Sequence, residues 1–235
     1  MNSEISYAIK RTKRRRSLAL TVNPAGAVTV LAPRWALPYF IERFVRHHTD
    51  WIQKKLAIFE GLRVKHPPKA FRTGERFSLW GQDYVLDVVP DPTCRRSRCE
   101  LLNGILRVQI PDMPLSETHD AVRWALKVWY KGQTEMKLLE TIPRWAEVMA
   151  VSPRQVQVVE QKRRWGSCSR QGRLRFNWRL SMMPTEILDY VAVHELAHLK
   201  AHNHSPHFWS IVRAALPDFK NRRAWLRENG QFLSL

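Results

Sequence analysis

Two histidines and a glutamate near residue 195 have a spacing that suits metal chemistry. His194 and His198 are four residues apart and Glu195 follows the first of them, which makes the pattern H-E-x-x-H. On a helix, residues four apart lie on one face, so both imidazoles can point at one ion. The glutamate beside them can take a proton from a metal-bound water, because the metal lowers the pKa of that water toward neutrality. The pattern therefore predicts a metal site, preferably for Zn²⁺, with Glu195 as a general base.

The helix expected to carry this pattern has an apolar face that leads into it. Ile187, Leu188 and Val191 lie on this face, and the two histidines and the glutamate continue it one turn later. Polar groups on a core-facing stripe are costly when they lack partners, and a bound metal removes that cost. The alternative is a set of structural histidines whose hydrogen bonds are satisfied by the protein.

A zinc site needs a third protein ligand, and His202, His204 and His207 follow within a few residues. His202 continues the four-residue spacing, but eight residues of straight helix span about 12 Å. Tetrahedral zinc ligands lie only about 3.4 Å apart, so one straight helix cannot supply all three. His204 lies between Asn203, which can end the helix, and the helix start at Ser205-Pro206. A turn there favours His204, with His207 or a distant carboxylate as alternatives.

Several elements are expected to position these side chains. A helix is expected from Pro184 to about residue 202, and another from Ser205 to about residue 215. Short strands at 156–159 and 173–176 flank a turn-like segment at 164–169. Upstream, residues 116–150 have helical periodicity, which Pro143 is expected to interrupt or kink.

The first part of the chain is expected to be rich in β-strands. Residues 18–22 and 28–30 read as a hairpin with its turn near Gly26, and residues 38–62 follow a helical period. Further strands are expected in the ranges 77–79, 84–89 and 101–110. The predicted fold is α+β, with a β-rich region over 1–110 that contains one helix at about 38–62, and a catalytic domain over 111–235.

Four linked motifs carry a resemblance to a known family. They are R-W-G-S-C-S at 164–169, N-W-R-L at 177–180, D-Y-V-x-x-H-E-L-x-H-L at 189–199 and N-H-S-x-x-F-W at 203–209. Together they resemble the YgjP-like metallopeptidases, and the likeness extends over nearly the whole chain. The resemblance implies a zincin-like α+β domain related to SprT-like and Wss1-like proteases, a peptide or protein substrate, and His204 as the third zinc ligand. Ala201 stands where metzincins have a glycine, so their geometry is not carried over.

Substrate contacts are expected near the motif at 164–169. An exposed backbone at Trp165, Gly166 and Ser167 could pair with an extended peptide, although Trp165 could equally pack in the core. Tyr190, one turn before His194, could orient the site through its hydroxyl or serve as a core aromatic. Cys168 could approach the metal as an inhibitory thiolate or remain a buried thiol.

The net charge of +18 arises from 39 Lys and Arg against 21 Asp and Glu. Such an excess favours anionic partners, and Arg14, Arg15 and Arg16 form a basic run that could bind nucleic acid or could be a solvated face. The three cysteines indicate no disulfide framework, and no apolar run is long enough for a membrane span. A cytoplasmic, non-membrane protein is expected, and its oligomeric state is not predicted.

The charge and the metal site together leave three hypotheses. The first is a zinc metallopeptidase that hydrolyses peptide bonds. The second is a nucleic-acid-associated protease, and the third is a zinc-stabilised nucleic-acid-binding module with little turnover. A structural zinc site does not need an adjacent glutamate, so Glu195 disfavours the third.

Overall fold

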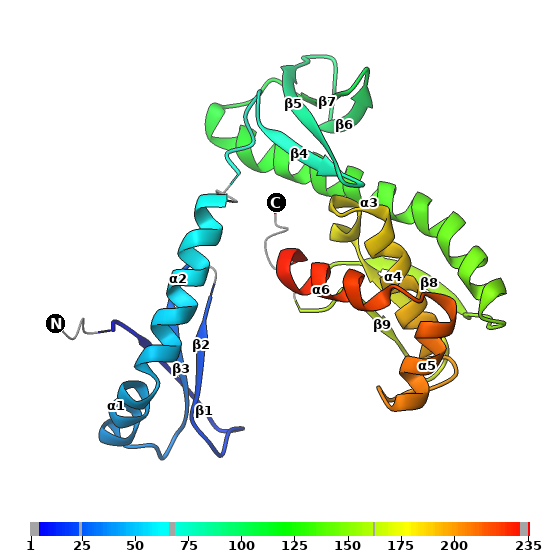
Figure 1. Cartoon of the computed structure of the whole chain (residues 1–235). Coiled ribbons are helices and arrows are strands. Elements are labelled where there is room, and N and C mark those ends of the chain that lie inside the picture. Colours follow the sequence, from blue (N-terminus) through cyan, green and yellow to red (C-terminus); the bar gives the residue numbers. More distant parts are fainter. Residues whose placement is uncertain (1–4, 24, 66–68, 162, 231–234) are drawn as a thin grey trace. The chain divides into compact units, whose positions relative to one another are not determined.

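The computed structural model describes residues 5–23, 25–65, 69–161, 163–230 and 235 (Figure 1). The chain forms two compact units, Met1–Pro68 and Lys69–Leu235, and each has a hydrophobic core of its own.

The first unit contains a three-stranded sheet and two helices. Its elements are β1 (Ala8–Thr12), β2 (Ala19–Val22), β3 (Val28–Pro33), α1 (Pro38–His47) and α2 (Thr49–Lys65). The predicted hairpin is present, since β2 pairs antiparallel with β3. Strand β1 was missed, because it is basic and largely exposed, and it pairs parallel with β3. The sheet and helices share a core through Val30, Ile41 and Ile52.

The helix expected over 38–62 is two helices in the structure. The break lies at His48, whose φ of −108° and ψ of 15° leave the helical region. The backbone N–H of His48 donates to the carbonyl of Val45, which closes the last turn of α1. The apolar spacing continues across this break, so the periodicity alone did not reveal it.

The second unit begins with a four-stranded sheet that packs on a long helix. The elements are β4 (Arg76–Leu79), β5 (Gln82–Pro90), β6 (Arg98–Leu102), β7 (Ile105–Ile110) and α3 (Leu115–Val148), with strand order β4-β5-β7-β6. Leu86 and Leu106 of the sheet share one buried core with Val122 and Leu126 of α3. The compact unit that contains the H-E-x-x-H helix therefore starts at Lys69, whereas the sequence analysis placed the start of the catalytic domain at residue 111.

Helix α3 is 34 residues long and continues past Pro143, where an interruption or a kink was expected. A proline inside a helix removes the hydrogen bond to the carbonyl four residues earlier, here that of Leu139. Leu139 is 76% exposed, so water can bond to this carbonyl and the helix can continue.

The remaining elements are the H-E-x-x-H helix, which is α4, and the strands and helices that complete the second unit. They are β8 (Gln155–Val159), β9 (Gly166–Cys168), β10 (Arg173–Asn177), the 3₁₀ helix η1 (Trp178–Met182), α4 (Thr185–Ala197), α5 (Pro206–Ala215) and α6 (Phe219–Asn229). The strand order is β8-β10-β9, so β9 is an edge strand within the segment that was expected to be a turn. Helix α4 ends at Ala197, earlier than the expected residue 202.

Candidate active site

Helix α4 is held from both sides through Asp189. The indole Nε1 of Trp145 on α3 donates to Asp189 Oδ1 at 2.9 Å, and Arg144 forms an ion pair with the same carboxylate. On the other side, Arg222 of α6 lies 3.9 Å from Asp189 and donates to the carbonyl of Glu186 at 2.9 Å. These contacts tie three helices together one turn before His194. Sequence reasoning placed Asp189 in a motif but assigned it no role.

The chain turns sharply after α4 and brings His204 back to the helix. The backbone N–H of Ala201 donates to the carbonyl of Ala197 at 3.0 Å, which closes the turn. The following helix α5 has Ser205 as its N-cap, and the Ser205 hydroxyl accepts from the N–H of Phe208. This is the cap expected from the sequence, and it sets the direction in which His204 points.

His194, His198 and His204 form a compact group of imidazoles. One ring nitrogen from each lies within 4.8 Å of the others. The Nε2 atoms of His194 and His204 are 3.1 Å apart, a separation that two ligands of one ion can have. Among the described residues, no other His, Cys, Asp or Glu belongs to this group, so His202 and His207 lie outside it.

His198 shows how the protein orients one of these rings. Its Nδ1 lies 3.0 Å from the carbonyl oxygen of Ala201, so Nδ1 carries the proton and donates it. Nε2 is then the nitrogen with a free lone pair. A backbone carbonyl that fixes the tautomer in this way is the usual support of a metal-binding histidine.

Burial keeps two of the imidazoles neutral. It lowers the pKa of His194 to about 3, with further lowering by His198 and His204. Burial also lowers the pKa of His198, against the hydrogen bond to Ala201, which raises it. Neutral imidazoles are the form that binds metal, so the donor set fits a divalent cation.

Glu195 lies beside the imidazoles in a buried position, with only 5% of the residue exposed. Burial raises the pKa of Glu195 to about 8, and the positive charge of Arg164 partly offsets this increase. Among the described residues, no side chain forms an ion pair with this carboxylate.

Gly166 makes room for this carboxylate. A Cβ atom at Gly166 would lie 2.5 Å from Oε1 of Glu195, closer than real contacts allow. Strand β9 therefore passes directly against the glutamate, and the close approach requires glycine.

Comparison with known proteins agrees with this geometry. A sequence model of the YgjP-like metallopeptidase domain matches residues 16–229, which is most of the chain. The protein belongs to the YgjP-like family. It is a metal-dependent peptidase, a hydrolase that acts on peptide or protein substrates, and its fold is α+β.

Two further comparisons add little to the family match. The metallopeptidase zymogen of Pyrococcus abyssi abylysin is 21% identical and has a TM-score of 0.37, with coverage of 40% of this chain and 95% of that one. No curated protein matches. Within the part of the chain that the structure describes, no helix is long and apolar enough to cross a membrane.

Asn177 positions the segment that precedes β9 in this YgjP-like protein. Its side-chain Nδ2 donates to the carbonyls of Gln161 at 2.7 Å and Arg164 at 3.0 Å. Its backbone N–H donates to the carbonyl of Trp165 at 2.8 Å. The sequence contained no clear signal for this role, because Asn177 follows the alternating arginines and apolar residues of β10.

The other residues named for substrate binding fall into two groups. Trp165, Gly166 and Ser167 lie on or next to β9, beside α4. Tyr190 is buried, and its ring centroid lies 6.0 Å from that of His194, so it packs under the site. Burial and the nearby Glu195 raise the pKa of Cys168 to about 11, which favours the thiol, and Cys168 lies outside the group of three imidazoles. Arg14, Arg15 and Arg16 belong to the first compact unit.

Proposed function

We propose that this YgjP-like protein is a zinc peptidase in which His194, His198 and His204 hold the ion and Glu195 is the general base. The observation that carries the proposal is the close group of three imidazoles next to a buried glutamate. Imidazole nitrogens are common ligands of zinc, and three protein ligands leave one position for the reaction. The bound metal would act as a Lewis acid, polarising the scissile carbonyl and activating water.

Glu195 would move the proton in this reaction. The positive charge of a bound metal would favour the ionised form of Glu195 against its burial, and the carboxylate could then accept a proton from water and give it to the leaving amine. Its burial keeps bulk water from competing for that proton. Gly166 keeps the carboxylate in place, because the strand backbone lies against it.

Strand β9 would bind the substrate backbone. It is the edge of its sheet, and it pairs with β10 on one side only. An extended peptide could add to the free edge through main-chain hydrogen bonds along Gly166 and Ser167. The scissile bond would then lie next to Glu195, with Tyr190 supporting His194 from below. The ring of Trp165 packs against the core beside Gly230, so Trp165 would contribute through its position next to β9.

Metal removal and restoration tests this proposal. The purified chain is expected to contain one zinc ion and to cleave a peptide library. Dialysis against a chelator should abolish cleavage, and addition of zinc should restore it. A protein that is fully loaded with zinc and cleaves nothing would instead favour a zinc-stabilised binding module.

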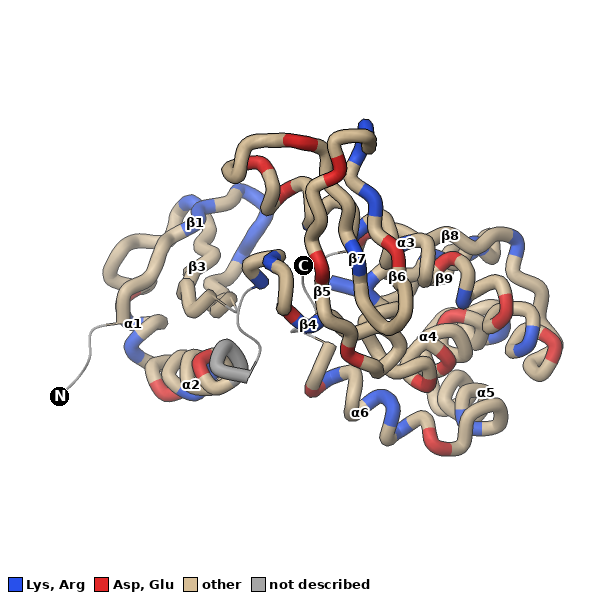
Figure 2. The backbone as a smooth tube through the Cα atoms, turned by 90° about the horizontal axis from the view of Figure 1, so that it is seen from above, with Lys and Arg blue, Asp and Glu red and all other residues tan. Residues whose placement is uncertain are grey.

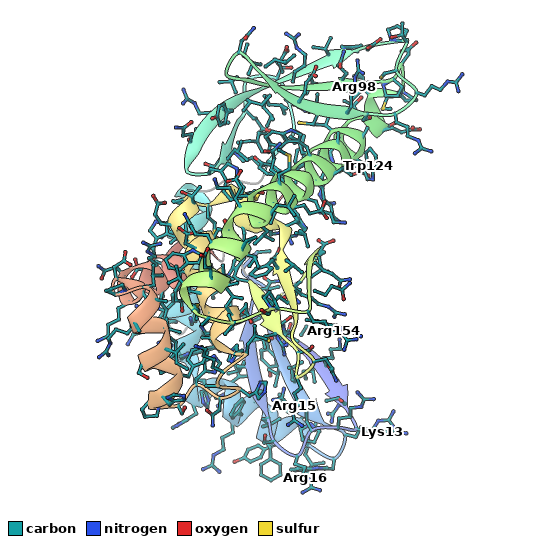
Figure 3. All side chains as sticks on the ribbon, turned by 90° about the vertical axis from the view of Figure 1, so that its right-hand side faces the viewer. Lys13, Arg15, Arg16, Arg98, Trp124 and Arg154 are labelled. Carbon is teal, nitrogen blue, oxygen red and sulfur yellow. The ribbon has the colours of Figure 1, made fainter. Side chains whose placement is uncertain are left out.

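A second candidate function is a protease that acts on proteins bound to nucleic acid. Arg11 connects two parts of the first unit, because its guanidinium donates to the carbonyls of Arg34 and Ala36. These bonds hold the end of β1, where Thr12 pairs with Pro33, beside the segment that contains exposed Trp35, and bases can stack on such a ring. Figure 3 shows the side chains of Lys13, Arg15 and Arg16 at one end of the three-stranded sheet.

Salt-dependent binding tests this second candidate. Binding of a single-stranded oligonucleotide should weaken steeply with salt, and the triple change of Arg14, Arg15 and Arg16 to Gln should reduce the salt slope by about two to three. Lack of binding at low salt would exclude this candidate and leave the peptidase proposal intact.

A further inference from the structure

A basic pocket lies between α5 and α6, next to the three imidazoles. Its volume is about 520 Å³, which is within the range of ligand-binding sites. The rings of Trp209 and Phe219 form one wall, stacked with centroids 5.4 Å apart and planes 17° apart. Ala224 on α6 has a small side chain, which leaves the space open. The cationic lining residues are Arg213, Lys220, Arg223 and Arg227.

The pocket has four positive charges and no carboxylate in its lining. Lys220, Arg223 and Arg227 are spaced three and four residues apart, so they lie on one face of α6. Blue segments mark this basic character along α6 in Figure 2. Of the four lining cations, only Arg227 has an ionic partner among the described residues, Glu228 at 3.8 Å. Like charges this close repel one another, and an anion in the pocket would relieve that repulsion.

The pocket adjoins the proposed metal site through Trp209. The ring centroid of Trp209 lies 5.8 Å from that of His204 and 5.9 Å from that of His194. The guanidinium of Arg223 lies over Trp209, 4.7 Å from its ring. One substrate can therefore reach the imidazoles and the pocket together.

We propose that this pocket binds a carboxylate of the peptide substrate and so directs cleavage toward acidic peptides. The inference rests on the proposed peptidase function. Carboxylates are the anionic groups of an unmodified peptide, and arginine binds them with paired, charge-assisted hydrogen bonds. Two sources are possible, an Asp or Glu side chain and the α-carboxylate of the peptide C-terminus.

The first test compares cleavage of matched peptides. Sequencing the products of a peptide library would locate the position at which Asp or Glu is enriched around the cleaved bond. A peptide with Glu there is expected to have a kcat/KM about tenfold or more above that of its Gln counterpart. Repeating both with an amidated C-terminus distinguishes the two sources. If a Glu side chain is bound, the Glu-over-Gln ratio survives amidation; if the terminal carboxylate is bound, amidation lowers kcat/KM of both peptides by about tenfold or more.

Variants then connect the preference to the pocket. Arg223→Gln with Arg227→Gln should reduce the Glu-over-Gln ratio of kcat/KM to about one. Lysine at both positions keeps the charge and should restore most of the ratio. The matched control is Arg95→Gln with Arg96→Gln, which removes two exposed charges from the same compact unit and should change neither rate. An acidic preference that survives in the pocket variant would overturn the inference. Cleavage that responds neither to Glu against Gln nor to amidation of the C-terminus would overturn it as well.

A binding measurement separates failure of the pocket from failure of the peptidase proposal. Acetylated, amidated Glu-Glu dipeptide is titrated into the zinc-loaded protein and the Trp209 indole N–H signal is followed by NMR, with Gln-Gln as control. If the chain cleaves no peptide but the Glu dipeptide shifts this signal in the wild type only, the pocket inference stands and the peptidase proposal fails. If the Glu and Gln dipeptides behave alike while a short oligonucleotide shifts the signal, the carboxylate inference fails.

Discussion

The backbone of Gly166 lies directly against the carboxylate of Glu195. A methyl group at Gly166 would lie 2.5 Å from Oε1 and 2.6 Å from Cγ of the glutamate. The edge strand and the helix therefore meet at the two groups that the proposed mechanism uses. These are the backbone of β9, which would bind the substrate, and the carboxylate of Glu195, which would accept the proton.

Gly166→Ala should displace Glu195 and reduce turnover without loss of metal. A misplacement of about 1 Å near the reacting groups can cost about 100-fold in rate. We expect kcat/KM to fall by at least that factor while zinc content remains at one ion per chain. Ser167→Ala, one residue along the same strand, is the matched control and should have little effect. A Gly166→Ala enzyme of normal activity would show that the strand does not constrain the base.

The motif alone predicted much of the site, because helix periodicity is a local property. Spacing placed His194 and His198 on one face, and the cap at Ser205 indicated where the chain turns back. The sequence did not reveal that β9 lies on Glu195 or that Asn177 holds the preceding segment, since both contacts join segments far apart in the chain. Strand β1 was missed for a similar reason, because it pairs with β3. The break at His48 was missed because the apolar spacing continues across it.

The three-imidazole assignment predicts unequal effects of histidine changes. Changing a residue that only supports a metal ligand weakens metal binding by up to about 100-fold. His204 is proposed to be a ligand itself, so His204→Ala should weaken zinc binding by more than that. His202→Ala and His207→Ala are the matched controls, because both lie outside the imidazole group. Competition with a zinc chelator of known affinity measures each variant. Loss of zinc from His202→Ala with retention in His204→Ala would refute the ligand set.

Asp189 is expected to stabilise the fold around α4. Asp189→Ala leaves the Trp145 indole without its acceptor and removes the ion pairs with Arg144 and Arg222, so the free energy of unfolding should fall by about 1–3 kcal/mol. Trp145→Phe removes only the indole donor and should cost less. Urea unfolding of the zinc-loaded proteins measures both. Equal stability of wild type and Asp189→Ala would show that these contacts contribute nothing.

The shared core of the second unit predicts where the chain can be cut. A fragment of residues 69–235 keeps the contacts of Leu86 and Leu106 with α3, and we expect it to unfold cooperatively and bind zinc. A fragment of residues 111–235 exposes the apolar face of α3, including Val122 and Leu126, and should aggregate or lose cooperative unfolding. Circular dichroism melting curves distinguish them. Equal stability of the two fragments would support a domain boundary at residue 110.

In the proposed mechanism, Glu195 transfers the proton while the three histidines hold the metal. The most direct test measures zinc content and peptide cleavage on the same sample of Glu195→Gln. Glutamine has nearly the same shape but cannot act as a base, so we predict one zinc ion per chain, an unchanged melting temperature and cleavage reduced by at least about 100-fold. Undiminished cleavage by a zinc-loaded Glu195→Gln protein would contradict the account.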